Sequence, residues 1–367
     1  MSTKIALLQA NPVVGDIKGN ADLISKFSNI AAQSGASFAV TTELAISGYP
    51  PRDLLLQSDF VSECHNVASN LQTEIPVLVG TPVPPISNRS LPGNGVVRAG
   101  DSVREVTRKQ LLPTYDVFDE ARYFEADERP GIARTIAGLD IGVTICEDAW
   151  QHCGATPNDY DSDPIAQIVE WGRQGVILDA TVNLSASPYH ANKSNARIAV
   201  ARSAAHSLNH PFLLANQVGG NDDLLFDGRS IIAWPDGTVV VGPAWSEGVL
   251  LTDLASPELC SWIGEGEISI LSPGEELEEN DEDLLDAIII GLSDYCKKSG
   301  IGKIVLGLSG GIDSALAACI ASAAVGSTNV TGISMPSKHS SQHSICLLYT
   351  SDAADDTPCV DLGGRRI

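Results

Sequence analysis

LDIGVTICEDAW, residues 139–150, reads as a buried apolar strand that ends in Cys146 and an acidic pair, Glu147 and Asp148. A thiol at the point where a buried strand leaves the core is held rigidly and can still meet a substrate. The backbone N–H of the next residue can then face a developing oxyanion. The stretch therefore indicates a nucleophilic cysteine, and its plain alternative is a buried, inert core cysteine.

Two other stretches bear on that choice. TTELAISGYPPRDLLL (41–56) puts Glu43 after an apolar run, and TRKQLLPTYDVFDEARYF (107–124) puts Lys109 before a Pro-containing turn. A carboxylate that takes the thiol proton, a thiolate that attacks and an ammonium that stabilises the oxyanion can together hydrolyse an amide. Taken singly, each residue has a dull interpretation: a solvated Glu, a solvated Lys and a core Cys.

Together, the three stretches resemble the Glu–Lys–Cys motifs of the nitrilase superfamily. Longer segments around these motifs are similar to the glutaminase domains of the glutamine-dependent NAD synthetase family. They are ELAISGYPPRDLLL, KQLLPTYDVFDEARYF and CEDAW. The resemblance runs from about residue 4 to about residue 345. It implies that Glu43 is the general base, Lys109 the oxyanion stabiliser and Cys146 the nucleophile, with no cofactor in this half.

The stretch NLSASPYHANK (183–193) has two interpretations. From its residues alone, the small residues before Pro188 favour an ordinary strand-to-helix cap. In the family, a matching SPxxxxK pattern helps to hold glutamine. The resemblance thus implies five glutamine-binding residues: Tyr115, Glu120, Glu147, Ser187 and Lys193. For Glu120, the plain alternative is a charge at a helix N-terminus.

A second motif, SGGIDS (309–314), follows a short apolar strand and opens a helix. Glycines let backbone N–H groups converge on an anion at a helix N-terminus, although a plain strand–helix turn has the same pattern. The string resembles the PP-loop of the ATP pyrophosphatase family and lacks the Gly-Lys-Ser/Thr ending of a Walker A loop. The resemblance implies that ATP is bound by Ser309, Gly310, Gly311, Ile312, Asp313 and Ser314, with Mg²⁺ near Asp313.

Strands alternate with helices along the chain, and hairpin patterns occur at 87–110 and around Asp236-Gly237. This predicts an α/β domain of two sheets packed face to face with helices outside. The resemblance implies a four-layer α-β-β-α sandwich, followed by an incomplete doubly wound parallel α/β domain. We expect a glutaminase domain over 1–270, an acidic linker over 271–282 and the first part of a synthetase domain over 283–345.

Composition narrows the class of protein. The 367 residues include 46 acidic and 23 basic ones, a formal net charge of −23, which argues against nonspecific binding to nucleic acid or to anionic membranes. No apolar stretch approaches the roughly 20 residues of a membrane span, and the N-terminus has no secretory pattern. Eight cysteines without a CxxC pair indicate reduced thiols in a cytoplasm. His152, His190, His206 and His210 form no metal-spaced cluster with them.

The last stretch, 346–367, departs from this pattern. CLLYTSDAAD (346–355) and CVDLGGRRI (359–367) both resemble the translation of a transposon-type sequencing-library adapter. We expect this tail not to be natural protein, the alternative being a divergent tail. On that expectation the synthetase domain is cut after its first two strands, and the chain does not make NAD as it stands.

The function that the resemblance implies is glutamine hydrolysis that supplies ammonia for the ATP-dependent amidation of deamido-NAD⁺ to NAD⁺. Its small-molecule partners are glutamine, deamido-NAD⁺ and ATP, and the family commonly forms homo-oligomers. A stand-alone amidase acting on a small amide is one alternative, against which the PP-loop argues. An inactive, aggregation-prone fragment is the other.

Overall fold

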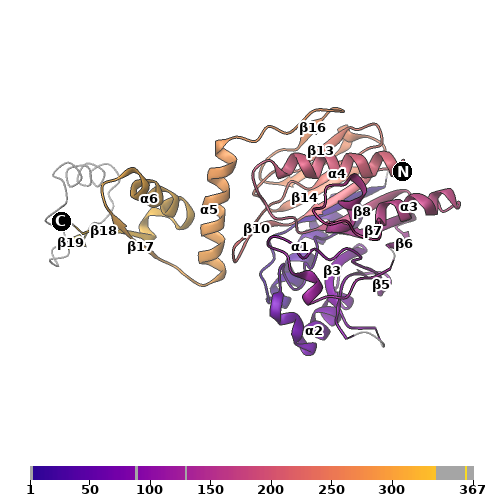
Figure 1. The fold of residues 1–367 in the computed structure, drawn as a ribbon, viewed down its shortest axis with the longest axis horizontal. Coiled ribbons are helices and arrows are strands. Elements are labelled where there is room, and N and C mark those ends of the chain that lie inside the picture. The colour runs from indigo at the N-terminus through magenta and orange to yellow at the C-terminus, as the bar shows by residue number, and fades with distance from the viewer. Residues whose placement is uncertain (1–2, 87–89, 129, 336–359, 362–367) are drawn as a thin grey trace. The chain divides into compact units, whose positions relative to one another are not determined.

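The computed structural model describes residues 3–86, 90–128, 130–335 and 360–361. The chain divides into two compact units, Met1–Glu279 and Asn280–Ile367. Both are drawn in Figure 1. In the described part of the chain, no helix is both long and apolar enough to cross a membrane.

The first unit is built on two seven-stranded sheets. The first has the order β15-β14-β1-β2-β3-β4-β5, with the bounds Ser261–Gly264, Gly248–Asp253, Lys4–Gln9, Ala36–Val40, Val77–Val83, Gly93–Ala99 and Arg104–Arg108. The second has the order β16-β13-β12-β9-β8-β7-β6, with the bounds Ser269–Leu271, Val239–Val241, Ile231–Ala233, Phe212–Asn216, Ala180–Ser185, Leu139–Ile145 and Gly131–Ile136. A separate hairpin pairs β10 (Val218–Asn221) with β11 (Leu224–Asp227).

Successive side chains along a strand point to opposite faces of the sheet, and this alternation separates the layers of the core. In β1, Ile5 and Leu7 join a core cluster that contains strands of both sheets, whereas Ala6 and Leu8 join a second cluster with the helices. That second cluster contains α1 (Ile17–Gln33) and α2 (Ser58–Ser69), which cover the first sheet (Figure 1). A third cluster packs α3 (Pro164–Arg173) and α4 (Lys193–Leu208) on the second sheet. The predicted α-β-β-α sandwich is confirmed.

The first sheet is completed by a strand from the far end of the unit. β14 pairs antiparallel with β1, from Lys4↔Asp253 to Gln9↔Gly248, so β1 lies between β14 and β2. The sequence patterns assigned no element beyond residue 242 in this unit. The return of the chain to its first strand is therefore a finding of the structure.

Local signals set where the helices of this unit begin. α1 begins at Ile17, because Asp16 caps it by accepting the Gly19 N–H. A 3₁₀ turn, Arg52–Leu56, precedes α2. The remaining short 3₁₀ turns of this unit are Glu120–Arg122, Cys146–Ala149, Gln151–Cys153 and Pro257–Leu259.

The segment 272–279, part of the expected linker, runs along α4. Arg202 donates to the carbonyls of Ser272 and Glu275 (both 2.8 Å), and Asn195 bonds the backbone of Leu277. Asn280 then caps the helix that opens the second unit, with Asp283 completing a capping box. The acidic stretch is thus bound to the first unit up to its boundary.

The second unit is a parallel α/β arrangement, which agrees with the predicted class. Its elements are α5 (Asp281–Lys298), β17 (Ile304–Leu308), α6 (Ile312–Val325), a 3₁₀ turn (Ser327–Asn329), β18 (Val330–Ser334) and β19 (Val360–Asp361). β17, β18 and β19 pair in parallel, with α6 between β17 and β18 in the chain. β19 lies within 346–367, where no strand pattern was expected; the other residues of that tail lie outside the described chain.

Candidate active site

Strand ends bring the three predicted catalytic residues to one edge of the sandwich. Glu43 follows β2 by three residues, Lys109 directly follows β5, and Cys146 directly follows β7. β2 and β5 belong to the first sheet and β7 to the second, so the site is built from both facing sheets. β7, β8 and β9 are parallel, which brings Ser187 and Asn216 to the same edge as Cys146.

The Lys109 ammonium is fully buried between two carboxylates. Its Nζ lies 2.7 Å from Glu43 Oε1 and 2.8 Å from the carboxylate of Glu120. The hydroxyl of Tyr49 donates to Glu120 Oε1 at 2.8 Å. A buried charge needs such partners, because removal of either ion from water costs several kcal/mol.

Glu43 is fixed by further donors. Its Oε1 accepts a bond from Asn94 Nδ2 (2.7 Å), and its Oε2 accepts the Ala186 N–H (3.1 Å). The carbonyl of Asn94 also accepts the backbone N–H of Lys109 (2.8 Å). Asn94 therefore joins the carboxylate and the lysine of the predicted triad.

Charge and burial together set the protonation of the cluster. Burial lowers the pKa of Lys109, but Glu120 and Glu43 outweigh it and raise the pKa well above its usual value. Burial raises the pKa of Glu120 to about 7, with Lys109 opposing the rise. Burial also raises the pKa of the Cys146 thiol well above its usual value; Glu43 adds to the rise and Lys109 opposes it. The resting thiol is therefore neutral and needs a base to become a nucleophile.

The backbone turns sharply at Cys146. Its φ is +43°, a conformation that residues with a side chain rarely adopt, where β7 passes into a 3₁₀ turn. Asp148 holds this turn: its carboxylate accepts the N–H groups of Ile145 (3.0 Å), Gln110 (3.0 Å) and Leu111 (2.9 Å). The segment that carries Lys109 is thereby tied to the turn that carries Cys146.

A glycine allows the approach of the segment that carries Glu43. A Cβ added at Gly80 of β3 would lie 2.3 Å from the carbonyl oxygen of Thr42 and 2.8 Å from the nitrogen of Leu44. Real Cβ atoms essentially never approach so closely, so any side chain at this position would displace the backbone at Thr42 and Leu44.

The five predicted glutamine-binding residues differ in their contacts. Glu120 belongs to the lysine cluster, and Tyr115 donates to Glu147 Oε1 at 2.7 Å. Lys193 Nζ lies over the rings of Trp150 (5.5 Å) and Phe118 (5.9 Å).

Ser187 is buried, and its hydroxyl has no hydrogen-bond partner among the described residues, so it can serve a ligand. The capping interpretation of the serines before Pro188 is wrong, because α4 is capped at Asn192, without a side-chain cap bond.

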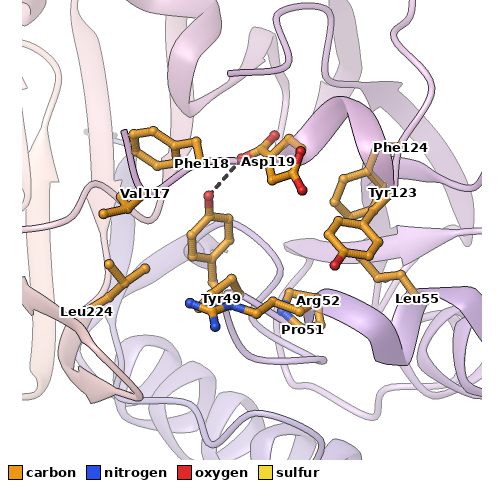
Figure 2. A pocket seen from close by; sticks show the side chains of 12 residues that line it. Tyr49, Pro51, Arg52, Leu55, Val117, Phe118, Asp119, Tyr123, Phe124 and Leu224 are labelled. Carbon is orange, nitrogen blue, oxygen red and sulfur yellow. Dashed lines mark hydrogen bonds between the residues drawn. The ribbon is translucent and has the colours of Figure 1, made fainter. Parts of the chain in front are cut away.

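Two cavities lie beside Glu120 and Lys193. A cavity of about 260 Å³ is lined by Glu120 and by the residues labelled in Figure 2, where the Tyr49 side chain points toward the segment at Phe118 and Asp119. The dashed line in Figure 2 is the hydrogen bond from Tyr49 to Glu120. A second cavity of about 210 Å³ is lined by Lys193 and shares Val117, Phe118 and Leu224 with the first. Cys146, 6% exposed, lines neither.

The predicted ATP loop has the expected strand–turn–helix form. β17 ends at Leu308, Gly310 has φ +79°, and α6 begins at Ile312, which is 83% exposed. Ser314 Oγ accepts the N–H of Ser309 (3.2 Å), and Ser309 Oγ accepts that of Gly311 (3.2 Å).

The N-terminus of α6 suits an anion, because it carries partial positive charge, whereas the N–H groups of Ser309 and Gly311 are bonded within the loop. Asp313, in the first turn of α6, offers one carboxylate. The described residues include no group of three His, Cys, Asp or Glu that could hold a metal ion. A Mg²⁺ ion near Asp313 would take its other ligands from phosphate and water, as Mg²⁺ commonly does.

Three residues of the site were not predicted. Asn94 binds Glu43, Tyr49 binds Glu120, and Asp148 binds backbone N–H groups beside Lys109 and Cys146. In the sequence Asn94 and Tyr49 read as ordinary strand or turn residues. Their roles depend on which strands pair, and no local pattern reports that. The Glu147-Asp148 pair was the one visible signal, because a buried acidic pair requires partners.

Comparison with known families finds two matches along the chain. Residues 4–263 match the family described as carbon-nitrogen hydrolase, and residues 284–349 match the family described as NAD synthase.

Two curated relatives match nearly all of the chain. The glutamine-dependent NAD(+) synthetase of Synechocystis sp. is 40% identical over 98% of this chain and 64% of its own length. That of Aquifex aeolicus is 34% identical over 93% of this chain and 62% of its own length. The chain thus spans less than two thirds of these relatives.

Solved structures give the same picture. The glutamine-dependent NAD+ synthetase of Acinetobacter baumannii, in complex with ADP, has a TM-score of 0.82 at 27% identity and covers 98% of this chain and 64% of its own. An amidase from Nesterenkonia sp. has a TM-score of 0.55 at 20% identity and covers 69% of this chain and 90% of its own. At 20% identity, this likeness shows that the amidase and the chain share a fold, and it shows no more than that.

Proposed function

This chain belongs to the carbon–nitrogen hydrolase family, and from that premise we propose that its first unit hydrolyses the side-chain amide of glutamine through Glu43, Lys109 and Cys146. The single observation that carries the proposal is the buried pairing of Lys109 with Glu43, at the sheet edge where Cys146 ends β7. A fully buried ammonium held between carboxylates is costly as a purely structural device.

The first step forms a thioester. Glu43 takes the proton of the neutral Cys146 thiol as the sulfur attacks the amide carbon, which leaves an oxyanion. Lys109 and the Glu147 backbone N–H stabilise that oxyanion. The C–N bond then breaks, and Glu43 returns the proton to the departing ammonia.

The second step releases glutamate. Glu43 takes a proton from water, the hydroxide attacks the thioester carbon, and the C–S bond breaks. The thiol is re-formed with the proton that Glu43 carried. Glutamine itself would be held by Tyr115, Glu120, Glu147, Ser187 and Lys193. The cavity at Lys193 and the Ser187 hydroxyl, which bonds no group in the described part of the chain, support this assignment.

The ammonia serves a second reaction, the ATP-dependent amidation of deamido-NAD⁺ to NAD⁺. Support comes from the NAD synthase match over 284–349 and from the names of the two curated relatives. Ser309 to Ser314 would hold the ATP phosphates through backbone N–H groups. Mg²⁺ near Asp313 would neutralise phosphate charge when bound.

The setting of the reaction follows from composition and family. We place the protein in the cytoplasm, because the described cysteines are all free thiols. The resemblance to the synthetase family further suggests that it acts as a homo-oligomer.

The test of the proposal is glutaminase activity of the full chain beside Cys146→Ala and Cys153→Ala. Cys153 is exposed, lies seven residues further on and takes no part in the proposed chemistry, so it serves as the matched control. We expect ammonia release from the wild type and from Cys153→Ala, and a loss of at least roughly a thousandfold in Cys146→Ala.

A folded chain that releases no ammonia from glutamine, alone or with ATP and deamido-NAD⁺ present, would contradict the proposal. Equal activity of the wild type and Cys146→Ala would contradict it as well.

A further inference from the structure

The first turn of α4 carries Lys193 but does not fix its own position. Its N-cap, Asn192, has φ +66° and makes no side-chain cap bond, and the first turn contains no acidic residue. A helix N-terminus leaves backbone N–H groups that need acceptors and carries partial positive charge. The N–H of Lys193 bonds the nearby carbonyl of His190 (3.0 Å), and side-chain acceptors for this turn come from elsewhere in the chain.

The segment 277–279 supplies them. Glu279 Oε2 accepts the N–H of Asn192 at 2.7 Å, where a carboxylate also complements the helix dipole. The side chain of Asn195 bonds both backbone groups of Leu277, accepting its N–H (2.8 Å) and donating to its carbonyl (2.9 Å). These three bonds hold Asn192 and Asn195, which lie before and after Lys193 in the sequence.

Arg229 links the first turn of α4 to Glu279. Its Nη1 lies 2.9 Å from Ser194 Oγ and 3.5 Å from Glu279 Oε1. The side chains of Arg229 and Glu279 are only 7% and 9% exposed. Glu279 is thus a half-buried, paired carboxylate, unlike the exposed acidic residues that precede it in the segment.

The other end of Lys193 faces the candidate site. Its Nζ is held over Trp150 and Phe118, and its charge acts on Cys146 and Glu147. It also lines the cavity that adjoins the one at Glu120.

We infer that Glu279, together with Leu277 and Arg229, is a positioning residue for glutamine: it holds the first turn of α4 so that Lys193 is aimed at the substrate. The inference rests on the proposed function, because it assigns Lys193 to glutamine binding. A residue just before the second unit, outside every motif in the sequence, then sets the affinity of the glutaminase site.

The experiment compares Glu279→Ala, Glu279→Gln and Asn195→Ala with the control Glu278→Ala in the full chain. Glu278 is the exposed neighbour of Glu279. Steady-state glutamine hydrolysis gives KM and kcat, and hydrogen exchange of the amides at 190–197 reports the anchoring.

We expect Glu279→Ala and Asn195→Ala to raise KM for glutamine roughly tenfold, with kcat within about twofold, and to speed exchange at 190–197. Glu279→Gln keeps an acceptor for Asn192 and should give an intermediate KM. Glu278→Ala should match the wild type.

Three results would overturn the inference. One is faster exchange with an unchanged KM. Another is a parallel loss of kcat, affinity and thermal stability, as a merely structural residue would give. If the wild type hydrolyses no glutamine, the proposed function fails, and the anchoring of Lys193 is then tested by itself. The third overturning result belongs to that separate test. Acetylation of Lys193 by acetic anhydride then tests the anchoring, and equal labelling rates in Glu279→Ala and Glu278→Ala would sink it.

Discussion

At the scale of single residues, Asn94 controls the charge next to the proposed base. Its amide donates to Glu43 Oε1, the same oxygen that faces Lys109. Asn94→Asp would set a second carboxylate against Glu43, and two adjacent carboxylates resist ionising together. We expect the acidic limb of the pH profile of kcat/KM to move to higher pH and activity at pH 7 to fall by at least roughly tenfold.

The matched control for Asn94 is Asn66→Asp, the same change at an exposed position of α2. Its pH profile should superimpose on that of the wild type. An unshifted acidic limb in Asn94→Asp would show that the amide does not tune the base.

Asp148 should make stability depend on pH. Burial raises its pKa from the ordinary 3.8 to about 7, against the backbone donors that lower it. The folded chain therefore holds a proton that the unfolded chain loses between about pH 4 and 7, and the stability linked to that proton disappears as pH rises through this window.

Urea unfolding at pH 5 and at pH 7.5 tests this. We expect the wild type to lose more stability than Asp148→Asn between the two pH values, because asparagine cannot titrate. Parallel losses in both proteins would rule out Asp148 as the titrating group.

At the scale of elements, the close approach of β3 to the segment after β2 places Glu43. Gly80→Ala would push a Cβ into the backbone at Thr42 and Leu44. The shift moves the base, and a displacement of about 1 Å can cost roughly a hundredfold in rate. We expect glutaminase kcat/KM to fall by about that factor while the chain stays folded.

Gly172→Ala is the control for Gly80→Ala, since an added Cβ in α3 meets nothing within 4 Å. It should keep full activity and gain up to about 1 kcal/mol of helix stability. Full activity in Gly80→Ala would show that the backbone can yield at this point.

The elements that could be predicted are those whose residues carry a local signal. β7 is a mainly apolar strand whose last five residues are all buried, and the β12–β13 hairpin has Asp236-Gly237 at its turn. The fold class follows from such local signals and from the family resemblance, and the proposed catalytic trio follows from the resemblance of its motifs. β14, by contrast, is defined by its pairing with β1, and Glu279 acts through a helix more than 80 positions earlier, so neither has a local signature.

At the scale of the whole molecule, the two units differ in their cores. The first has three layers of buried side chains between and around its sheets. In the described residues of the second, only Ala287, Asp294, Cys296, Ala321, Val330 and Gly332 are buried. A unit with so little buried apolar area opens more readily.

Native-state hydrogen exchange should reveal this difference. We expect the amides of β17 and α6 to exchange at least roughly a hundredfold faster than those of β7 and β8. Comparable protection in the two sets would mean that the second unit is stabilised by more than its described core.

The pairing of β1 with β14 also bears on synthesis. Translation delivers β1 first, but its antiparallel neighbour is complete only when Asp253 has been made. Until then one edge of β1 has no strand to pair with, and an unpaired edge is a template for association between chains. The first sheet therefore cannot be completed while the first unit is being made. For almost the whole of that unit's translation, β1 must be kept from pairing with other chains.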